Sequence, residues 1–192
     1  HIPAAVPAAK GLGERSRLIQ EKDLNKAYLD GALAQVNIAA IKKSGFKTAF
    51  DCRYGSASDV FSAFAEKTGL KTELLNCGRD VLFGGRFPDT DESALKELSR
   101  LASSKKLAAG FAASGDGGRF GVVDSKGRWI PSGEVAALIL NHLAGAKKLS
   151  GRVCRSVMTS QLVDVVAKHY RLEVRETPVG FKQMGVSRTS SR

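Results

Sequence analysis

The residues with the clearest chemical potential lie in one glycine-rich stretch, Phe111 to Asp124, which reads FAASGDGGRFGVVD. Its centre, Ser-Gly-Asp-Gly-Gly-Arg, predicts a tight turn whose backbone can approach a charged group closely. A loop that holds a hard cation normally offers several carboxylates, because Mg²⁺ prefers anionic oxygen ligands. This loop offers only Asp116, next to the cationic Arg119, so a divalent ion gains little by binding there.

Cysteine and histidine do not indicate a metal site of another kind. The three cysteines, Cys52, Cys77 and Cys154, lie far apart and form no Cys-x-x-Cys pair, and the three histidines show no ligand spacing. We therefore expect reduced, mostly buried thiols in a cytoplasmic protein, and no transition-metal site.

Composition limits the class of protein and its partners. The chain has 192 residues, of which 43% are hydrophobic and 26% charged, as in soluble globular proteins. No apolar run reaches the roughly 20 residues of a membrane span, so we expect no membrane partner. The formal net charge is +11, and residues 147–192 carry ten Lys or Arg against three Asp or Glu. This excess attracts polyanions, phosphorylated metabolites or an acidic partner, but no aromatic stacking motif supports nucleic-acid binding.

Helical and strand patterns alternate along the first two thirds of the chain. Residues 1–21 mix Pro, Ala and Gly without a period, which predicts an N-terminal arm or linker. Apolar periodicity then predicts helices over 22–43, 56–67 and 91–103, strands over 46–51, 71–75 and 107–112, and a hairpin of 119–124 with 128–131. Alternating strands and helices predict an α/β sandwich.

A second, shorter alternation follows the hairpin. It predicts a helix over 133–144, a basic turn over 147–152, a strand over 153–158, a helix that begins near Ser160 and a strand over 172–174. One βαβ unit with a single further helix is too little to cover a sheet on both faces. We therefore expect this second domain to be partial.

Four short motifs occur along the chain in a fixed order. They are Phe83-Gly-Gly-Arg-Phe-Pro-Asp89, the segment from Gly115 to Asp124, Gly133-Glu134 before a helix, and Thr177-Pro-Val-Gly-Phe-Lys182. Together with the arrangement of elements, they resemble the α-D-phosphohexomutases, the phosphoglucomutase and phosphomannomutase superfamily, in the second and third of four domains. The resemblance covers roughly residues 22 to 186, and the ordered set is far more specific than any one motif.

This resemblance implies a fold and a domain organisation. It implies an α/β/α sandwich domain with a mixed sheet over residues 22–130, corresponding to domain II of the family. A partial second domain of the same type, corresponding to domain III, would follow over 131–192, with 1–21 as the arm or linker.

The resemblance also bears on the cofactor. The family's metal loop reads Asp-Gly-Asp-x-Asp-Arg, and its three carboxylates hold Mg²⁺ beside a phosphoserine, where the ion neutralises charge during phosphoryl transfer. The corresponding positions here are Ser114, Asp116 and Gly118. Because two of the three ligands are replaced, we predict weak or no Mg²⁺ binding at Asp116.

Two cations correspond to family residues near the bound substrate, and each has a structural alternative. Arg119 and Lys182 resemble residues that contact the hexose phosphate. Arg119 could equally pair with a neighbouring Asp, Lys182 could be an exposed loop lysine, and Asp116 could simply accept backbone N–H groups in a tight turn. Turn or helix-start roles are the alternatives for Gly84, Gly85, Arg86, Ser132 and Glu134.

Several family motifs have no counterpart in this chain. Nothing matches the phosphoserine motif Thr-Ala-Ser-His-Asn-Pro, the Ser-Gly-Thr cluster of the fourth domain, or the sugar-reading Gly-Glu-x-Ser motif. We therefore assign no catalytic residue and predict a central fragment, inactive by itself as a mutase. It would meet hexose phosphate only within a parent protein that supplies domains I and IV. The alternative is a non-catalytic binding or interaction module that uses the same fold and its basic surface.

Overall fold

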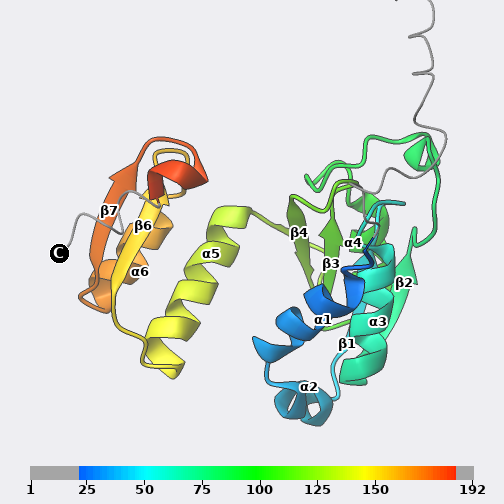
Figure 1. Ribbon diagram of the computed structural model, residues 1–192, viewed down its shortest axis with the longest axis horizontal. Helices are drawn as coiled ribbons and strands as arrows, with labels where there is room; N and C mark the ends of the chain where they lie inside the picture. Colours follow the sequence, from blue (N-terminus) through cyan, green and yellow to red (C-terminus); the bar gives the residue numbers. More distant parts are fainter. Residues whose placement is uncertain (1–21, 185–192) are drawn as a thin grey trace, which may run out of the picture. The chain divides into compact units, whose positions relative to one another are not determined.

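The computed structural model describes residues 22–184 (Figure 1). The arm predicted over 1–21 and the end of the second predicted domain, 185–192, lie outside the described residues. The chain divides into two compact units, the first ending at Asn37 and the second beginning at Ile38. Within 22–184, no helix combines the length and the apolar character that a membrane crossing requires.

The single helix predicted over 22–43 is wrong, because the structure has two helices there. Helix α1 (Asn25–Ala34) ends in a turn, and helix α2 (Ile38–Ser44) begins after it. The N–H groups of Gln35 and Val36 donate to carbonyls three residues earlier, which tightens the last turn of α1. The residues between the two helices are Gln-Val-Asn. The helix is interrupted there because Val and Asn are weak helix formers.

A five-stranded mixed sheet forms the centre of the second unit. Its strands are β1 (Lys47–Asp51), β2 (Lys71–Leu75), β3 (Ala109–Ala113), β4 (Phe120–Asp124) and β5 (Trp129–Ile130). The order is β2-β1-β3-β4-β5, with β2, β1 and β3 parallel and β4 and β5 antiparallel to their neighbours. The predicted mixed sheet and hairpin are confirmed, with strand ends displaced by at most about two residues.

Helices cover both faces of this sheet. Alternate residues of β1 point to opposite faces, so their contacts show which helix lies on which face. Phe50 stacks on Phe61 of helix α3 (Ser58–Thr68), with ring centroids 4.6 Å apart. Ala49, the preceding residue, belongs instead to the core under helix α4 (Lys96–Ser104). The α/β/α sandwich predicted for the first domain is therefore confirmed.

The main core lies between α4 and the sheet. Its buried members are Ala49, Leu95, Leu98, Ala102, Leu107, Ala112 and Val123. Leu75, Leu101 and Trp129 pack against them, and the Trp129 indole N–H donates to the Thr90 carbonyl over 3.1 Å. These side chains come from all five strands, from α4 and from the residues beside them, so the sheet and α4 are stabilised together.

Helix α4 begins later than the sequence predicts. The acidic residue expected in its first turn, Asp91, lies in a turn before the helix and accepts hydrogen bonds from the Ser93 hydroxyl and the Ala94 N–H. These bonds lower the pKa of Asp91. A short aspartate satisfies nearby backbone donors in a turn, so Asp91 stabilises the approach to the helix rather than the helix itself.

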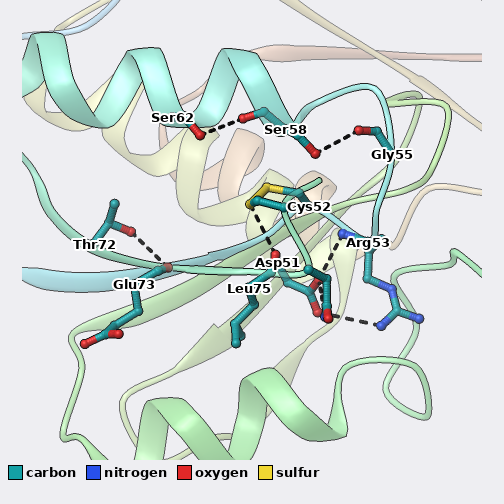
Figure 2. The surroundings of a disulfide bond; sticks show 11 residues. Asp51, Cys52, Arg53, Gly55, Ser58, Ser62, Thr72, Glu73 and Leu75 are labelled. Atoms are coloured by element: carbon teal, nitrogen blue, oxygen red, sulfur yellow. Dashed lines mark hydrogen bonds and ion pairs between the residues drawn. A yellow bond between two sulfur atoms is a disulfide. The ribbon is translucent and has the colours of Figure 1, made fainter. Parts of the chain in front are cut away.

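The prediction of three reduced cysteines is also wrong. Cys52 and Cys77 form a disulfide, whereas Cys154 is free (Figure 2). The two partners are 25 positions apart, so the sequence does not show that they lie close together. Cys52 follows β1 directly and Cys77 follows β2 by two residues, and because these strands are neighbours, the two Cα atoms lie 5.1 Å apart. This separation suits a disulfide.

Residues 132–177 form a smaller βαβ arrangement. It consists of α5 (Ser132–Asn141), the π-helical turn η2 (His142–Ala146), β6 (Arg152–Ser156), α6 (Leu162–His169) and β7 (Glu173–Thr177). Strands β6 and β7 pair in parallel, and α5 packs against α6. At that contact a Cβ on Gly133 would come within 2.5 Å of the Ser160 Cβ, so the glycine permits the close approach.

A buried arginine links the strands of this arrangement to α6. Arg155 on β6 makes two hydrogen bonds of 2.6 Å to the Asp164 carboxylate, and its third nitrogen donates to Glu176 on β7, also over 2.6 Å. The side chain of Arg155 is nearly inaccessible, which favours the bidentate pair. The hydrogen bonds from Arg155 lower the pKa of Asp164.

The Asp164 pair predicts an acid-sensitive contribution to stability. Its folded-state pKa lies below the ordinary value of about 3.9, so the contribution is complete above that pH and is lost as the pH falls through the folded pKa. We expect Asp164→Asn to lower the free energy of unfolding at neutral pH, with the difference from wild type shrinking below about pH 4. Urea unfolding along a pH series measures it.

The matched control removes an exposed partner. Glu173 pairs with Arg152 over 2.9 Å at the surface, where an ion pair contributes at most about 1 kcal/mol. Glu173→Gln should therefore change stability little at any pH. An equal, pH-independent loss for both variants would contradict the assignment to Asp164.

Candidate functional site

Three loops gather at one edge of the five-stranded sheet. Because β1, β2 and β3 are parallel, the loops that follow them start from the same edge. These loops carry residues 52–57, 76–90 and 114–119, and the last contains the Ser-Gly-Asp-Gly-Gly-Arg turn. In open α/β sheets, ligands bind outside the carboxyl ends of the strands, which makes this edge the candidate site.

Backbone hydrogen bonds join the three loops. The Ser56 N–H donates to the Gly115 carbonyl over 2.9 Å, and the Gly115 N–H donates to the Pro88 carbonyl over 3.0 Å. The Tyr54 N–H donates to the Asn76 carbonyl over 2.7 Å. Each loop is therefore bonded to at least one of the others, and the conformation of residues 114–119 depends on all three.

Two glycines allow this close packing. A Cβ on Gly55 would lie 2.5 Å from both the Cα and the carbonyl oxygen of Gly115, so backbone meets backbone there. A Cβ on Gly115 would lie 2.9 Å from the Pro88 Cβ and 2.8 Å from the Phe83 ring. The Phe83–Asp89 motif and the glycine-rich loop therefore form one packed unit.

A buried ion pair lies at the base of the loops (Figure 2). One Asp51 oxygen accepts the Arg53 N–H over 2.9 Å and the Asn76 amide over 3.0 Å. The other Asp51 oxygen lies 3.6 Å from Arg53 Nη1, and Arg53 Nη2 donates to the Phe87 carbonyl over 2.8 Å. This pair connects β1 to the loops that follow β1 and β2.

The Asp116 carboxylate is occupied by donors from its own loop. Its Oδ1 accepts the Ser114 hydroxyl over 2.5 Å and the Gly118 N–H over 2.9 Å. The Ser114 oxygen in turn accepts the Arg119 N–H over 2.9 Å. The Ser114 hydroxyl, followed by the Gly118 N–H, lowers the pKa of Asp116. The alternative in which Asp116 serves as a turn acceptor is thus realised in the structure.

This arrangement does not fit Mg²⁺. The ion prefers several hard anionic oxygens in octahedral geometry, and the three aligned positions supply one carboxylate, a hydroxyl that donates to it, and a glycine. Within residues 22–184, no group of three or more His, Cys, Asp or Glu is placed to hold a metal. The loop is stabilised by N–H and O–H donors where a cation would need acceptors.

Arg119 pairs with a carboxylate from the neighbouring loop. Its Nη1 lies 2.9 Å from Asp89 Oδ2, so the alternative of an Arg–Asp pair is also realised. The Arg119 side chain is 60% exposed, so it remains accessible from solvent. Lys182, the other predicted substrate contact, is exposed in a helical turn after β7, and no described hydrogen bond or ion pair joins it to the Asp116 loop.

The remaining motif residues take local structural roles. Gly84 and Gly85 lie in the 3₁₀ turn η1 (Phe83–Gly85), where Gly84 has φ +67°. Arg86 pairs with Glu97 over 2.9 Å on the surface. Ser132 and Glu134 begin α5, as expected for helix-start residues.

Two open cavities flank the loop cluster. One, of about 500 Å³, is lined by Ser56, Asp59, Arg79 and Gly115 among others. The second, of about 560 Å³, includes Arg53, Asp89 and Lys96 in its wall. Both mix cationic and anionic groups, so the edge can contact a polar ligand that carries charge.

Sequence reasoning missed the residues that hold the site together. Asp51, Arg53 and Asn76 were not named, and Asp89 was named only as the end of a motif, although these residues join the loops to one another. A usable signal exists for the first two, because the polar run Asp51-Cys-Arg53 directly follows a buried strand. Asp89, the partner of Arg119, and Asn76, the second partner of Asp51, lie 30 and 25 positions away in sequence, and the strand order brings them together.

Comparison with known families covers nearly all of the described chain. Residues 26–127 match the sequence model of phosphoglucomutase/phosphomannomutase, alpha/beta/alpha domain II, and residues 131–187 match that of domain III.

Individual relatives are longer than this chain. A phosphoglucosamine/phosphogalactosamine mutase of Sulfurisphaera tokodaii is 29% identical over 163 residues, which cover 84% of this chain and 36% of the relative. A cytoplasmic phosphoglucomutase of Solanum tuberosum is 34% identical over 152 residues, covering 73% and 26%. The chain thus spans about a third or less of the length of these relatives.

Solved structures show the same fold. A phosphoglucomutase/phosphomannomutase family protein from Burkholderia thailandensis matches with a TM-score of 0.77 at 17% identity, covering 90% of this chain and 37% of that chain. Parafusin, a phosphoglucomutase from Paramecium, matches with a TM-score of 0.71 at 25% identity, covering 83% and 30%.

The loop packing predicts that Gly55→Ala is disruptive. The new Cβ would collide with the Gly115 backbone, which cannot move without breaking the Ser56–Gly115 hydrogen bond. We expect a loss of about 1 to 3 kcal/mol in urea unfolding and faster hydrogen exchange at Ser56. Gly118→Ala is the control, because its Cβ would meet side-chain atoms of Asp116 at 3.2 Å or more and no backbone atom of another loop. Equal effects of the two substitutions would refute the proposed packing.

Proposed function

Because the chain belongs to the phosphoglucomutase/phosphomannomutase family, we propose that it forms the central part of a protein that acts on hexose phosphates. The main support for this proposal is that the Phe83–Asp89 motif and the glycine-rich loop pack together at the carboxyl edge of the sheet. In this proposal residues 22–130 act as domain II and residues 131–192 as part of domain III. Both would contribute to one wall of a phosphosugar site.

Catalysis in this proposal depends on parts of the protein that this chain does not contain. The phosphoserine motif expected for the family mechanism does not occur in the sequence. Without a nucleophile, phosphoryl transfer through a covalent enzyme intermediate cannot proceed. The chain alone is therefore proposed to be inactive as a mutase and to need domains I and IV.

Arg119 and Lys182 are the proposed contacts to the phosphate group. Arg119 is held by Asp89 in a surface ion pair, and such pairs contribute at most about 1 kcal/mol. A phosphate dianion offers three acceptor oxygens and forms stronger charge-assisted bonds with a guanidinium group. Arg119 can therefore exchange Asp89 for phosphate at small cost. Lys182 would add a second positive charge.

The Asp116 loop is proposed to keep its shape without a cation. Hydrogen bonds from Ser114 and Gly118 to Asp116 close the loop where carboxylates would otherwise repel one another. The phosphoryl chemistry that Mg²⁺ supports in the family would then be lost or weakened at this position.

The cytoplasm is the proposed location, as expected from the sequence. The Solanum tuberosum relative is a cytoplasmic phosphoglucomutase. The Cys52–Cys77 disulfide is uncommon for a reducing compartment, where such bonds are usually transient.

Direct titration tests the cation-free loop. We expect calorimetry to give a Mg²⁺ dissociation constant weaker than about 100 μM, equivalent to less than about 5.5 kcal/mol of binding. The double variant Ser114→Asp, Gly118→Asp restores three carboxylates and should bind at least about tenfold more tightly. Tight binding by the native chain would contradict the proposal. If the double variant does not fold, Gly118→Asp alone serves as the gain-of-affinity control.

Thermal unfolding tests the phosphosugar site. A ligand at about five times its dissociation constant adds about 1 kcal/mol, which raises Tm by about 2 to 4 °C. We expect glucose 1-phosphate or mannose 1-phosphate to produce such a shift, and Arg119→Gln to reduce it. Lys105→Gln is a control, because Lys105 is 49% exposed and also forms a 2.9 Å ion pair, with Glu73, but precedes β3 and so lies away from the carboxyl edge. Stabilisation by nucleic acid but not by hexose phosphates would favour the binding-module alternative.

A further inference from the structure

We propose that the Cys52–Cys77 disulfide is a site of reversible thiol–disulfide exchange with a dithiol reductant, and that its reduction loosens the loops of the candidate site. The observation behind it is the position of the bond. It joins the chain just after β1 to the chain just after β2, at the edge where the three loops gather (Figure 2). This inference is independent of which ligand the site binds.

The bond restrains the least protected strand of the sheet. Strand β2 is the terminal strand in the order β2-β1-β3-β4-β5, and its residues are exposed or only half-buried. Among residues 22–184, its only neighbour in the sheet is β1, and α3 packs against it. The disulfide is the covalent restraint at the carboxyl end of this strand, so its loss should be felt first in β2 and the loop after it.

The two cysteine residues differ in exposure. Cys52 is fully buried, whereas Cys77 is half-buried and is followed by the exposed Gly78 and Arg79. A reductant is therefore expected to approach the bond from the side of Cys77 rather than from the side of Cys52. Arg79 adds positive charge to this segment, which favours the approach of a thiolate.

The exchange is a balanced two-electron reaction. One thiolate of the dithiol attacks Cys77 Sγ, forming a mixed disulfide and releasing Cys52 as a thiolate that takes up a proton. The second thiolate of the reductant then attacks its own bound sulfur, closing a cyclic disulfide and releasing Cys77, which also takes up a proton. The protein disulfide is reduced to two thiols and the dithiol is oxidised.

Reduction is coupled to the site through consecutive backbone bonds. Cys52 lies between Asp51 and Arg53, and its N–H donates to the Leu75 carbonyl over 2.9 Å. Further along the same loop, the Tyr54 and Ser56 N–H groups donate to the loops after β2 and β3. Greater mobility of the loop after β2 would therefore reach the glycine-rich loop through two contacts. The loop after β2 is bonded to the loop after β1, which in turn is bonded to the loop after β3.

The experiment uses the full chain with Cys154→Ser, so that only two cysteines remain. After native treatment with millimolar dithiothreitol, alkylation and mass spectrometry should find both thiols, with Cys77 modified much faster than Cys52. Hydrogen exchange should become at least about tenfold faster at Tyr54 and Ser56. The antiparallel β3–β4 amides should change little. Tm should fall by about 5 to 15 °C.

Two single variants distinguish thiol–disulfide exchange at Cys77 from a purely structural role of the disulfide. Cys52→Ser leaves the accessible Cys77 and should form a mixed disulfide with oxidised glutathione, whereas Cys77→Ser leaves the buried Cys52 and should not. Three outcomes would overturn the proposal: free thiols at both positions in protein prepared without reductant, a disulfide that dithiothreitol reduces only in urea, or reduction without faster exchange at Tyr54 and Ser56.

Discussion

The buried contact between Asp51 and Arg53 is the constraint on which the carboxyl edge of the sheet depends. Removing two charges from water costs several kcal/mol per ion, and only good geometry and further hydrogen bonds offset it. Here Asp51 receives the Arg53 and Asn76 donors, and Arg53 reaches the Phe87 carbonyl. These partners come from the loops after β1 and β2, so both loops must be in place for the pair to be tolerated.

The glycine-rich loop is bonded to the loops that this ion pair connects. Its own conformation depends on a different electrostatic interaction, the repulsion between carboxylates. Three carboxylates in a tight turn repel one another unless a cation lies between them. With one carboxylate, the repulsion is gone, and donors that belong to the turn can satisfy Asp116. The lowered pKa of Asp116 reflects the same donors, which stabilise its anionic form. The loop conformation is thus maintained by hydrogen bonds within the chain, anchored through Gly115 to the loops beside it.

Local periodicity predicted the sheet, the helices on it and the hairpin, because the apolar pattern of a segment shows which face of that one element is buried. It could not predict contacts that depend on strand order. The Cys52–Cys77 bond and the Arg119–Asp89 pair join residues 25 and 30 positions apart, and nothing in the spacing distinguishes them from other pairs. The break after α1 was missed for another reason, since two weak helix formers, Val36 and Asn37, interrupt a pattern that remains apolar on both sides.

Fold and chemistry are carried by different residues in this chain. The core under α4 consists of apolar side chains from the sheet and one helix, and none of its members lies in the glycine-rich loop. Carboxylates can therefore be replaced at two loop positions while the sandwich, and with it the close packing of Gly55 on Gly115, is retained. The family models span both sets of residues, whereas any metal binding or substrate contact would depend on the second set. The scaffold by itself therefore does not determine what the glycine-rich loop binds.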